Sequence, residues 1–207
     1  MIFKKTVKFH NLTNAYFYMD DTTDHGFLID PGGEAEVLLD IIRKSLWTIE
    51  AILITHGHYD HIGAADKIRN ALSIPIYAHR NADTFLLDSS HNRSSFHGPG
   101  ITLQNVTCLD DGDMITLKVN PDFSLKVLHT PGHTSDSVTY YSQKDKSAFV
   151  GDLIYKGGVG KYTFYGGDKN SLFKSILTKI FTMPDDTVLY SGHTDPTTVM
   201  NEKHSAP

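Results

Sequence analysis

Short apolar runs alternate with amphipathic stretches along most of the chain. Runs that favour buried, extended backbone occur at residues 14–19, 26–29, 49–54, 74–78, 114–119, 123–128, 137–141, 147–150 and 187–190. Apolar side chains recur at helical spacing in residues 34–46 and 171–181, and helices are also expected at 61–71 and 81–87. Because strands and helices alternate in sequence, the pattern predicts an α/β fold.

Other stretches fit neither pattern. Residues 89–100 are polar and rich in Ser, Gly and His, which is typical of a loop or flap. This loop and residues 157–168 are expected to shape any pocket. The polar tail from Asn201 onwards is expected to be frayed.

The composition is that of an ordinary globular domain. Of 207 residues, 40% are hydrophobic and 21% are charged, so residues 1–207 are expected to form one domain with a sizeable core. A net charge of −5 lacks the positive surface that nucleic-acid binding requires. We therefore expect no nucleic-acid partner, and the sequence leaves the oligomeric state open.

Cysteine usage and hydropathy predict where the protein works. The single cysteine, Cys108, excludes an intramolecular disulfide and favours a reducing compartment, the cytoplasm. No apolar run approaches the ~18–20 residues of a membrane span. The basic residues within 1–10 are not followed by an apolar stretch, so no signal peptide and no membrane partner are expected.

Histidine and aspartate side chains gather in one short segment. This segment directly follows the apolar run 52–54 and reads Thr55-His56-Gly57-His58-Tyr59-Asp60-His61. Residues two apart on an extended chain point the same way, so His56 and His58 can converge on one point. Packing gives no reason for so many imidazole and carboxylate groups in one place. These are ligands of zinc, and iron or manganese also accept them, so the segment predicts a metal site.

Three further candidates stand just beyond strand-like runs: His133, Asp152 and His193. In α/β sheets, ligands collect at strand ends, so separate strands can deliver these side chains to one edge. A lone histidine after a strand is more often a surface or hydrogen-bonded residue. The case for His133 and His193 therefore depends on their meeting the first cluster. His91 and His97, in the polar loop, are positions from which histidine can approach a substrate.

These residues resemble the motifs of the metallo-β-lactamase superfamily. The segment from His56 to His61 is similar to the HxHxDH signature of the superfamily. Three later segments resemble the later motifs of the superfamily in the same order: Thr130-Pro131-Gly132-His133-Thr134, Gly151-Asp152 and Ser191-Gly192-His193. Asp30-Pro31-Gly32 is similar to its early turn. Within the superfamily, the chain most resembles short, single-domain relatives of glyoxalase II, the hydroxyacylglutathione hydrolase. The resemblance implies a four-layer αββα sandwich with the active site at one edge.

The resemblance also implies a ligand set for two divalent metal ions, with zinc expected and iron or manganese as alternatives. The first ion would be held by His56, His58 and His133. The second would be held by Asp60, His61 and His193, and Asp152 would bridge both. Among neighbouring residues, Lys161 matches a basic position that contacts substrate in the family. Tyr162, beside Lys161, is a second candidate to contact substrate, and Asp30 is expected to orient a ligating histidine by a hydrogen bond.

The implied activity is hydrolysis of an acyl thioester, similar to hydroxyacylglutathione, by a hydroxide that bridges the two ions. Asp60 would act catalytically by accepting a hydrogen bond from this hydroxide, and the partner would be a small-molecule substrate. The alternatives are a mononuclear iron enzyme similar to persulfide dioxygenase and a lactone or ester hydrolase of the same fold. The commonest β-lactamases of this fold have Cys where Asp152 stands, which disfavours antibiotic hydrolysis. Cys108 lies far from every motif and is expected to be a buried apolar residue.

Overall fold

The computed structural model describes residues 1–205 and contains two mixed sheets that pack face to face. The strands of the first sheet follow sequence order, with antiparallel pairing from β1 to β3 and parallel pairing from β3 to β6. They are β1 (Ile2–Phe9), β2 (Asn11–Met19), β3 (His25–Ile29), β4 (Thr48–Leu53), β5 (Ile76–His79) and β6 (Thr107–Leu109).

The second sheet has the order β14-β13-β10-β9-β8-β7. Its pairs are antiparallel except β10 with β13, which are parallel. The strands are β7 (Met114–Thr116), β8 (Ser124–His129), β9 (Val138–Ser142), β10 (Ser147–Gly151), β13 (Val188–Ser191) and β14 (Thr197–Thr198). A separate small hairpin joins β11 (Ile154–Tyr155) to β12 (Gly158–Val159).

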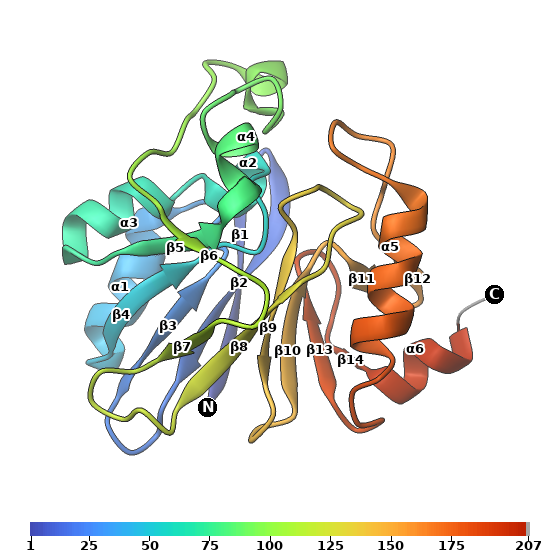
Figure 1. Ribbon diagram of the computed structural model, residues 1–207. Helices are drawn as coiled ribbons and strands as arrows, with labels where there is room; N and C mark the ends of the chain where they lie inside the picture. Colours follow the sequence, from blue (N-terminus) through green and yellow to red (C-terminus); the bar gives the residue numbers. More distant parts are fainter. Residues whose placement is uncertain (206–207) are drawn as a thin grey trace.

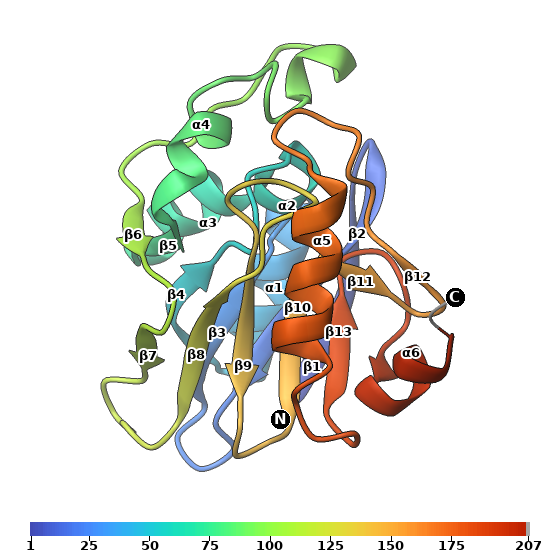
Figure 2. The ribbon, with the colours of Figure 1, turned by 45° about the vertical axis from the view of Figure 1, so that its right-hand side comes forward.

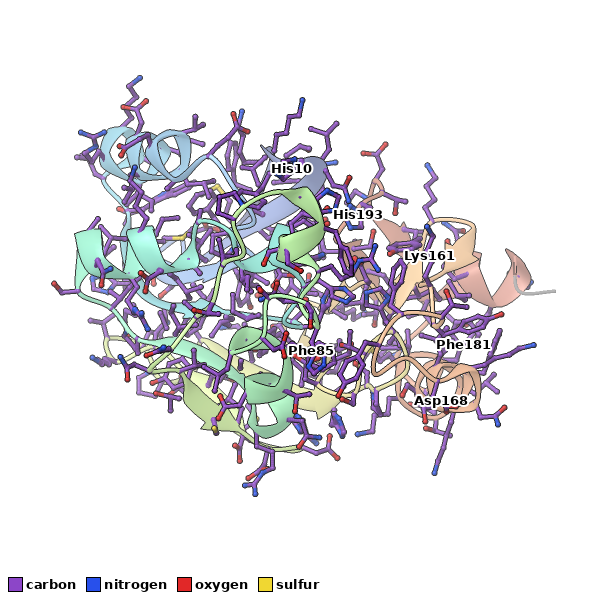
Figure 3. The ribbon with its side chains drawn as sticks, turned by 90° about the horizontal axis from the view of Figure 1, so that it is seen from above. His10, Phe85, Lys161, Asp168, Phe181 and His193 are labelled. Carbon is purple, nitrogen blue, oxygen red and sulfur yellow. The ribbon has the colours of Figure 1, made fainter. Side chains whose placement is uncertain are left out.

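Helices cover the outer faces of both sheets, as Figure 1 shows. The first sheet is covered by α1 (Ala35–Ser45) and α3 (Ala65–Leu72); the second is covered by α5 (Lys169–Ser175), which continues as a π-helical turn (Ile176–Ile180), and by α6 (Val199–Ser205). The short helices α2 (Tyr59–Ile62) and α4 (Asp83–Leu86) lie at the upper edge of Figure 1, and 3-10 turns cover Arg80–Ala82 and Ser94–His97. Within the described residues, no helix is long and apolar enough to cross a bilayer.

Strand β2 shows how the alternation of side chains produces this layering. Tyr16 and Tyr18 belong to the core between the sheets, whereas Phe17 and Met19 pack in the core that α1 and α3 cover. Successive strand residues point to opposite faces, and both faces of this strand are buried. A third core lies between the second sheet and α5. Each fully buried large apolar side chain contributes about 1.5–3 kcal/mol to the stability of these cores. The two sheets that pack face to face between outer helices confirm the αββα sandwich.

The structure differs from the sequence expectations in several places. The helix expected at 61–71 is divided into α2 and α3 at Gly63, whose backbone approaches the carbonyl oxygen of Gly32 so closely that a Cβ would lie 2.4 Å from it. Strand β1 was not expected, because only Val7 in it is fully buried and its pairing with β2 holds it. Two expectations are wrong. Cys108 is exposed on the edge strand β6, and residues 199–205 form α6; the last two tail residues lie outside the described part.

Candidate metal centre

The candidate side chains follow strands whose carboxyl ends meet at one edge of the sandwich. His56 and His58 follow β4, His133 follows β8, Asp152 follows β10 and His193 follows β13. Strands β8, β10 and β13 run in the same direction in the second sheet, and their carboxyl ends lie with that of β4 at the upper edge in Figure 1. Helix α2 begins directly after His58 and adds Asp60 and His61 to the same edge. The structure therefore brings together every metal-site candidate that the sequence singled out.

Three histidine nitrogens converge on one point. His58 Nδ1 lies 3.1 Å from His56 Nε2 and 2.9 Å from His133 Nε2. All of these side chains are buried. Nitrogens this close cannot all carry protons, and a neutral His133 whose Nδ1 donates to the carbonyl of Lys161 presents the lone pair of its Nε2 to the cluster. A cation placed between the three nitrogens binds such lone pairs, which is why the arrangement fits a metal ion.

The remaining candidates form a second cluster beside the first. Asp152 Oδ1 lies 3.4 Å from His61 Nε2, and Asp152 Oδ2 lies 3.2 Å from His193 Nε2 and 3.6 Å from His133 Nε2. Asp60 Oδ2 lies 3.4 Å from His193 Nε2. Asp152 thus stands between the two clusters. The donor atoms of His56, His61 and Asp152 lie within 4.8 Å of one another, as do those of Asp60, His61 and His193.

Hydrogen bonds at the far nitrogens orient these imidazole rings. His61 Nδ1 donates to Asp30 Oδ2 over 2.8 Å, as expected for Asp30. Asp30 is itself held, since it accepts the backbone N–H and the hydroxyl of Thr55. His133 Nδ1 donates to the carbonyl of Lys161 over 2.6 Å, and His193 Nδ1 donates to that of Leu12 over 2.8 Å. In the neutral ring, each of these bonds places the proton on Nδ1 and turns Nε2 toward the cluster, which is the tautomer that binds metal.

The pKa directions follow from the same geometry. Burial, followed by mutual repulsion, lowers the pKa of His56 and His58 well below the ordinary value, and burial also lowers that of His133. Burial likewise opposes charge on His61, but Asp30 and Asp152 outweigh it and raise its pKa well above the ordinary value. Without metal, the first cluster is therefore made of neutral imidazoles, whereas His61 in the second cluster holds an extra proton that a bound ion would replace.

Unpaired atoms are the strongest sign that the residues fit two ions. Among the described residues, His61 Nε2 and Asp152 Oδ1 are buried and form no hydrogen bond, although they lie 3.4 Å apart as an ion pair. An unsatisfied buried polar atom is expensive, about 1–3 kcal/mol, and coordination satisfies it. Histidine nitrogens with carboxylate oxygens are a donor set that divalent zinc, iron and manganese accept.

A cavity of about 450 Å³ opens onto the cluster. Lys161 and Phe164 line it, as do residues that the sequence did not indicate, namely Asn11, Leu12, Tyr59, Arg93 and Tyr155. Tyr162 packs against the core beneath α5 and is not among the lining residues that the structure describes. His97 reaches the cavity, whereas His91 stacks on Tyr165. Seen from above, His193, Lys161 and His10 border one side of the site and Phe85 lies across from them (Figure 3).

Asp136 is a buried carboxyl beside the metal-site loop that the sequence analysis did not single out. Its Oδ2 accepts the backbone N–H of Gly57 over 2.9 Å, and it is 1% exposed. Burial raises the pKa of Asp136 to about 7, although hydrogen bonds from Thr134 and Gly57 oppose the shift. No local motif distinguishes this aspartate, because only the fold places it against Gly57.

Asparagine at position 136 is expected to stabilise the metal-free protein at pH 8 but not at pH 4. Because the folded pKa lies above the unfolded one, the folded state binds the extra proton, so stability falls as pH rises between the two values and levels off above about 7. Asp136→Asn removes this loss. Chemical denaturation of both proteins at several pH values checks it, with the exposed Asp122→Asn as control. A difference between wild type and Asp136→Asn that stays constant with pH contradicts the assignment.

Comparison with known proteins finds similarity along nearly the whole chain. A family model described as the metallo-beta-lactamase superfamily matches residues 11–193. The probable metallo-hydrolase YqgX of Bacillus subtilis is 38% identical over 195 residues, covering 94% of this chain and 90% of that protein. The hydroxyacylglutathione hydrolase GloC of Haemophilus influenzae is 34% identical over 190 residues, covering 90% of this chain and 88% of that protein.

Solved structures show the same likeness. The crystal structure of BLEG-1 B3 metallo-beta-lactamase superposes with a TM-score of 0.92 at 36% identity, covering 99% of this chain and 97% of that one. The crystal structure of TTHA1623 in a di-iron-bound form superposes with a TM-score of 0.87 at 32% identity, covering 99% and 98%. The matched regions include the whole candidate metal centre.

Proposed function

The chain belongs to the metallo-beta-lactamase superfamily and is a metallo-hydrolase of that superfamily; from this premise we propose that it is a binuclear enzyme that cleaves acyl thioesters. The main support for two ions is the position of Asp152, whose two carboxylate oxygens face different histidines at 3.2–3.6 Å. One cluster of three histidines beside a second cluster with two carboxylates is more than a single ion requires.

In this proposal His56, His58 and His133 hold one ion, and Asp60, His61 and His193 hold the other, with Asp152 between them. Zinc is the proposed metal, and iron is the alternative that the di-iron form of the similar structure TTHA1623 favours. When bound, two such ions polarise a carbonyl group and lower the pKa of water. The protein's own part is to orient the reacting groups and move protons.

Asp60 is the proposed catalytic residue. Its Oδ2 accepts a hydrogen bond from the hydroxyl of Thr13 over 3.2 Å, which holds the carboxylate at the floor of the cavity. From there it can accept a hydrogen bond from the attacking water and so orient that water toward the substrate. Tyr155 lines the same cavity; burial, with the nearby charges of Asp152 and Asp60, raises the pKa of its hydroxyl, which therefore stays protonated as a donor.

The thioester substrate is supported by the relative named hydroxyacylglutathione hydrolase and by Lys161, a cation at the cavity that can attract an anionic substrate. The second candidate is hydrolysis of a β-lactam, which the likeness to BLEG-1 favours at 36% identity. Both reactions attack a carbonyl carbon. We further propose that the chain is one domain, that its partner is a small molecule, and that it works in the cytoplasm, which its single cysteine supports.

Protein purified without added metal or chelator is expected to contain about two ions per chain by elemental analysis and to hydrolyse a hydroxyacyl glutathione thioester. Dialysis against a chelator is expected to abolish the activity, and returning zinc or iron is expected to restore it. A penicillin and a cephalosporin are assayed in parallel. Efficient β-lactam cleavage with no thioester cleavage would reject thioester hydrolysis and support β-lactam hydrolysis instead. One iron per chain with oxygen consumption on a persulfide overturns the binuclear hydrolase.

A further inference from the structure

Arg93 differs from the other arginines in the described part of the chain. Arg43, Arg69 and Arg80 each contact an aspartate, at Asp40, Asp66 and Asp110 respectively. Arg93 makes no carboxylate contact among residues 1–205, although it is half-buried and lines the cavity of the metal centre. A half-buried guanidinium without a counterion is costly unless a ligand supplies one.

The position of Arg93 is held by aromatic contacts across the cavity. Its guanidinium carbon lies 3.8 Å from the ring centroid of Phe164, a cation–π contact that occupies a face of the ring and leaves the N–H edge of the guanidinium free. The Phe164 ring lies 5.9 Å from that of His58 and 6.2 Å from that of His133. Arg93 therefore stands one aromatic ring away from the first histidine cluster.

The loop that carries Arg93 is fastened at both of its ends. His91 stacks on Tyr165 with centroids 3.6 Å apart, and His97 stacks on His10 with centroids 5.0 Å apart. In Figure 2 this loop, above α4, and the loop that leads into α5 meet over the site. The guanidinium is thus presented by a braced segment, and so little conformational entropy is lost when it binds a ligand.

The surroundings make this part of the cavity positive. Lys161 Nζ lies 5.6 Å from the centroid of the same Phe164 ring, and the described residues offer it no ion-pair partner. The carboxylates that line the cavity, Asp60 and Asp152, face the histidines of the metal centre. Arg93 and Lys161 therefore make the part of the cavity around Phe164 positive, although the chain as a whole has a net charge of −5.

We propose that Arg93 is a specificity-determining residue that binds a carboxylate of the substrate, so that the enzyme selects acyl thioesters that carry a negative charge. This inference rests on the proposed thioester hydrolysis. A guanidinium offers paired N–H donors in a fork that matches a carboxylate, and it remains charged at every physiological pH. Lys161 adds a second, less directional charge.

Matched substrates test the inference. One pair is the acetyl thioester of 3-mercaptopropionate and that of its neutral amide; a second pair, made with a neutral thiol, is the succinyl thioester and the corresponding amide. The wild type is expected to prefer the anion in at least one pair by about tenfold in KM, with similar kcat, because a charge-assisted hydrogen bond is worth about that much. The pair that shows the preference tells which half of the substrate carries the carboxylate.

Variants of the arginines isolate the effect. Arg93→Gln is expected to remove the preference, Arg93→Lys to retain part of it, and Arg80→Gln, which changes an arginine paired with Asp110 away from the cavity, to keep it fully. Equal KM values for anion and amide in the wild type overturn the proposal. Equal loss in Arg93→Gln and Arg93→Lys also overturns it, because it shows that the residue only holds the loop.

A binding measurement separates this inference from the proposed function. The thioethers 3-(methylthio)propionate and 3-(methylthio)propanamide contain no bond that a thioesterase cleaves, and their dissociation constants can be read by NMR titration of labelled protein. The wild type is expected to bind the anion about tenfold more tightly, and Arg93→Gln to bind both alike. If no thioester is cleaved but the anion is preferred, only the proposed function fails. If thioesters are cleaved without a charge preference in either assay, only the role of Arg93 fails.

Discussion

Asp152→Ala is expected to reduce hydrolysis by at least about a thousandfold and to lower the metal content from about two ions per chain to one or fewer. Loss of a group that merely supports a ligand usually costs about 10–100-fold, and Asp152 contacts His61, His133 and His193 directly. The charge of Asp152 also balances His61 and His193, whose proximity holds the pKa of this carboxyl well below its usual range against the effect of burial.

Elemental analysis and the thioester assay, both on protein purified without added metal, measure the two effects. The matched control is Asp122→Ala, which removes an exposed carboxylate outside the cavity. Circular dichroism establishes whether the variant keeps its fold. A folded Asp152→Ala protein that retains two ions and most of its activity is incompatible with a bridging role for this residue.

Gly160→Ala is expected to reduce both stability and activity, because it displaces the backbone that holds the metal centre. A Cβ at Gly160 would lie 1.7 Å from the carbonyl oxygen of Asp152. The backbone N–H of Gly160 also donates a hydrogen bond to the carbonyl oxygen of Leu153, which holds the two segments together. The chain must therefore shift, and with it the carbonyl of Lys161 that orients His133. We expect a loss of about 3 kcal/mol in the free energy of unfolding. Because displacements near 1 Å can cost about a hundredfold in rate, activity should fall by about that factor.

Gly158→Ala is the control, two residues earlier in the same segment. A Cβ there would have no atom of the described residues within 4 Å, and the substitution is expected to change the free energy of unfolding by less than about 0.5 kcal/mol. Urea denaturation and steady-state kinetics of both variants give the comparison. Gly160→Ala protein with wild-type stability and rate shows that the close approach to Asp152 has no consequence.

The fold was predictable where a pattern repeats within one element. The nearly continuous apolar run at residues 49–54 predicted the strand β4, and the helical spacing at 34–46 predicted the helix α1. Strand β1 escaped prediction because its side chains are mostly exposed and its pairing partner, β2, provides the hydrogen bonds that hold it. The exposure of Cys108 could not be predicted from the sequence either, because whether a strand lies at the edge of a sheet depends on the order of all the strands.

The candidate site divides in the same way. The segment from His56 to His61 predicts a metal site by itself, because its histidine and aspartate ligands are close together in the sequence. His133 and His193 were candidates because each follows a strand-like run, and the family resemblance strengthened them, but their meeting with Asp152 is a property of the folded chain. Asp136 and Gly160 matter because of what lies against them, and no sequence pattern carries that information.

The sequence by itself determined the α/β class of fold and the identity of the metal-site candidates, because periodic burial and clustered donors are local properties that survive in a linear pattern. The αββα sandwich followed only from the resemblance of its motifs to a known family. Only the tertiary structure decided what borders the cavity. It placed Arg93 over Phe164 with no counterion among residues 1–205, while Tyr162 packs against the core beneath α5. Loops far apart in sequence make these contacts, and their geometry depends on how two sheets and their connections pack together.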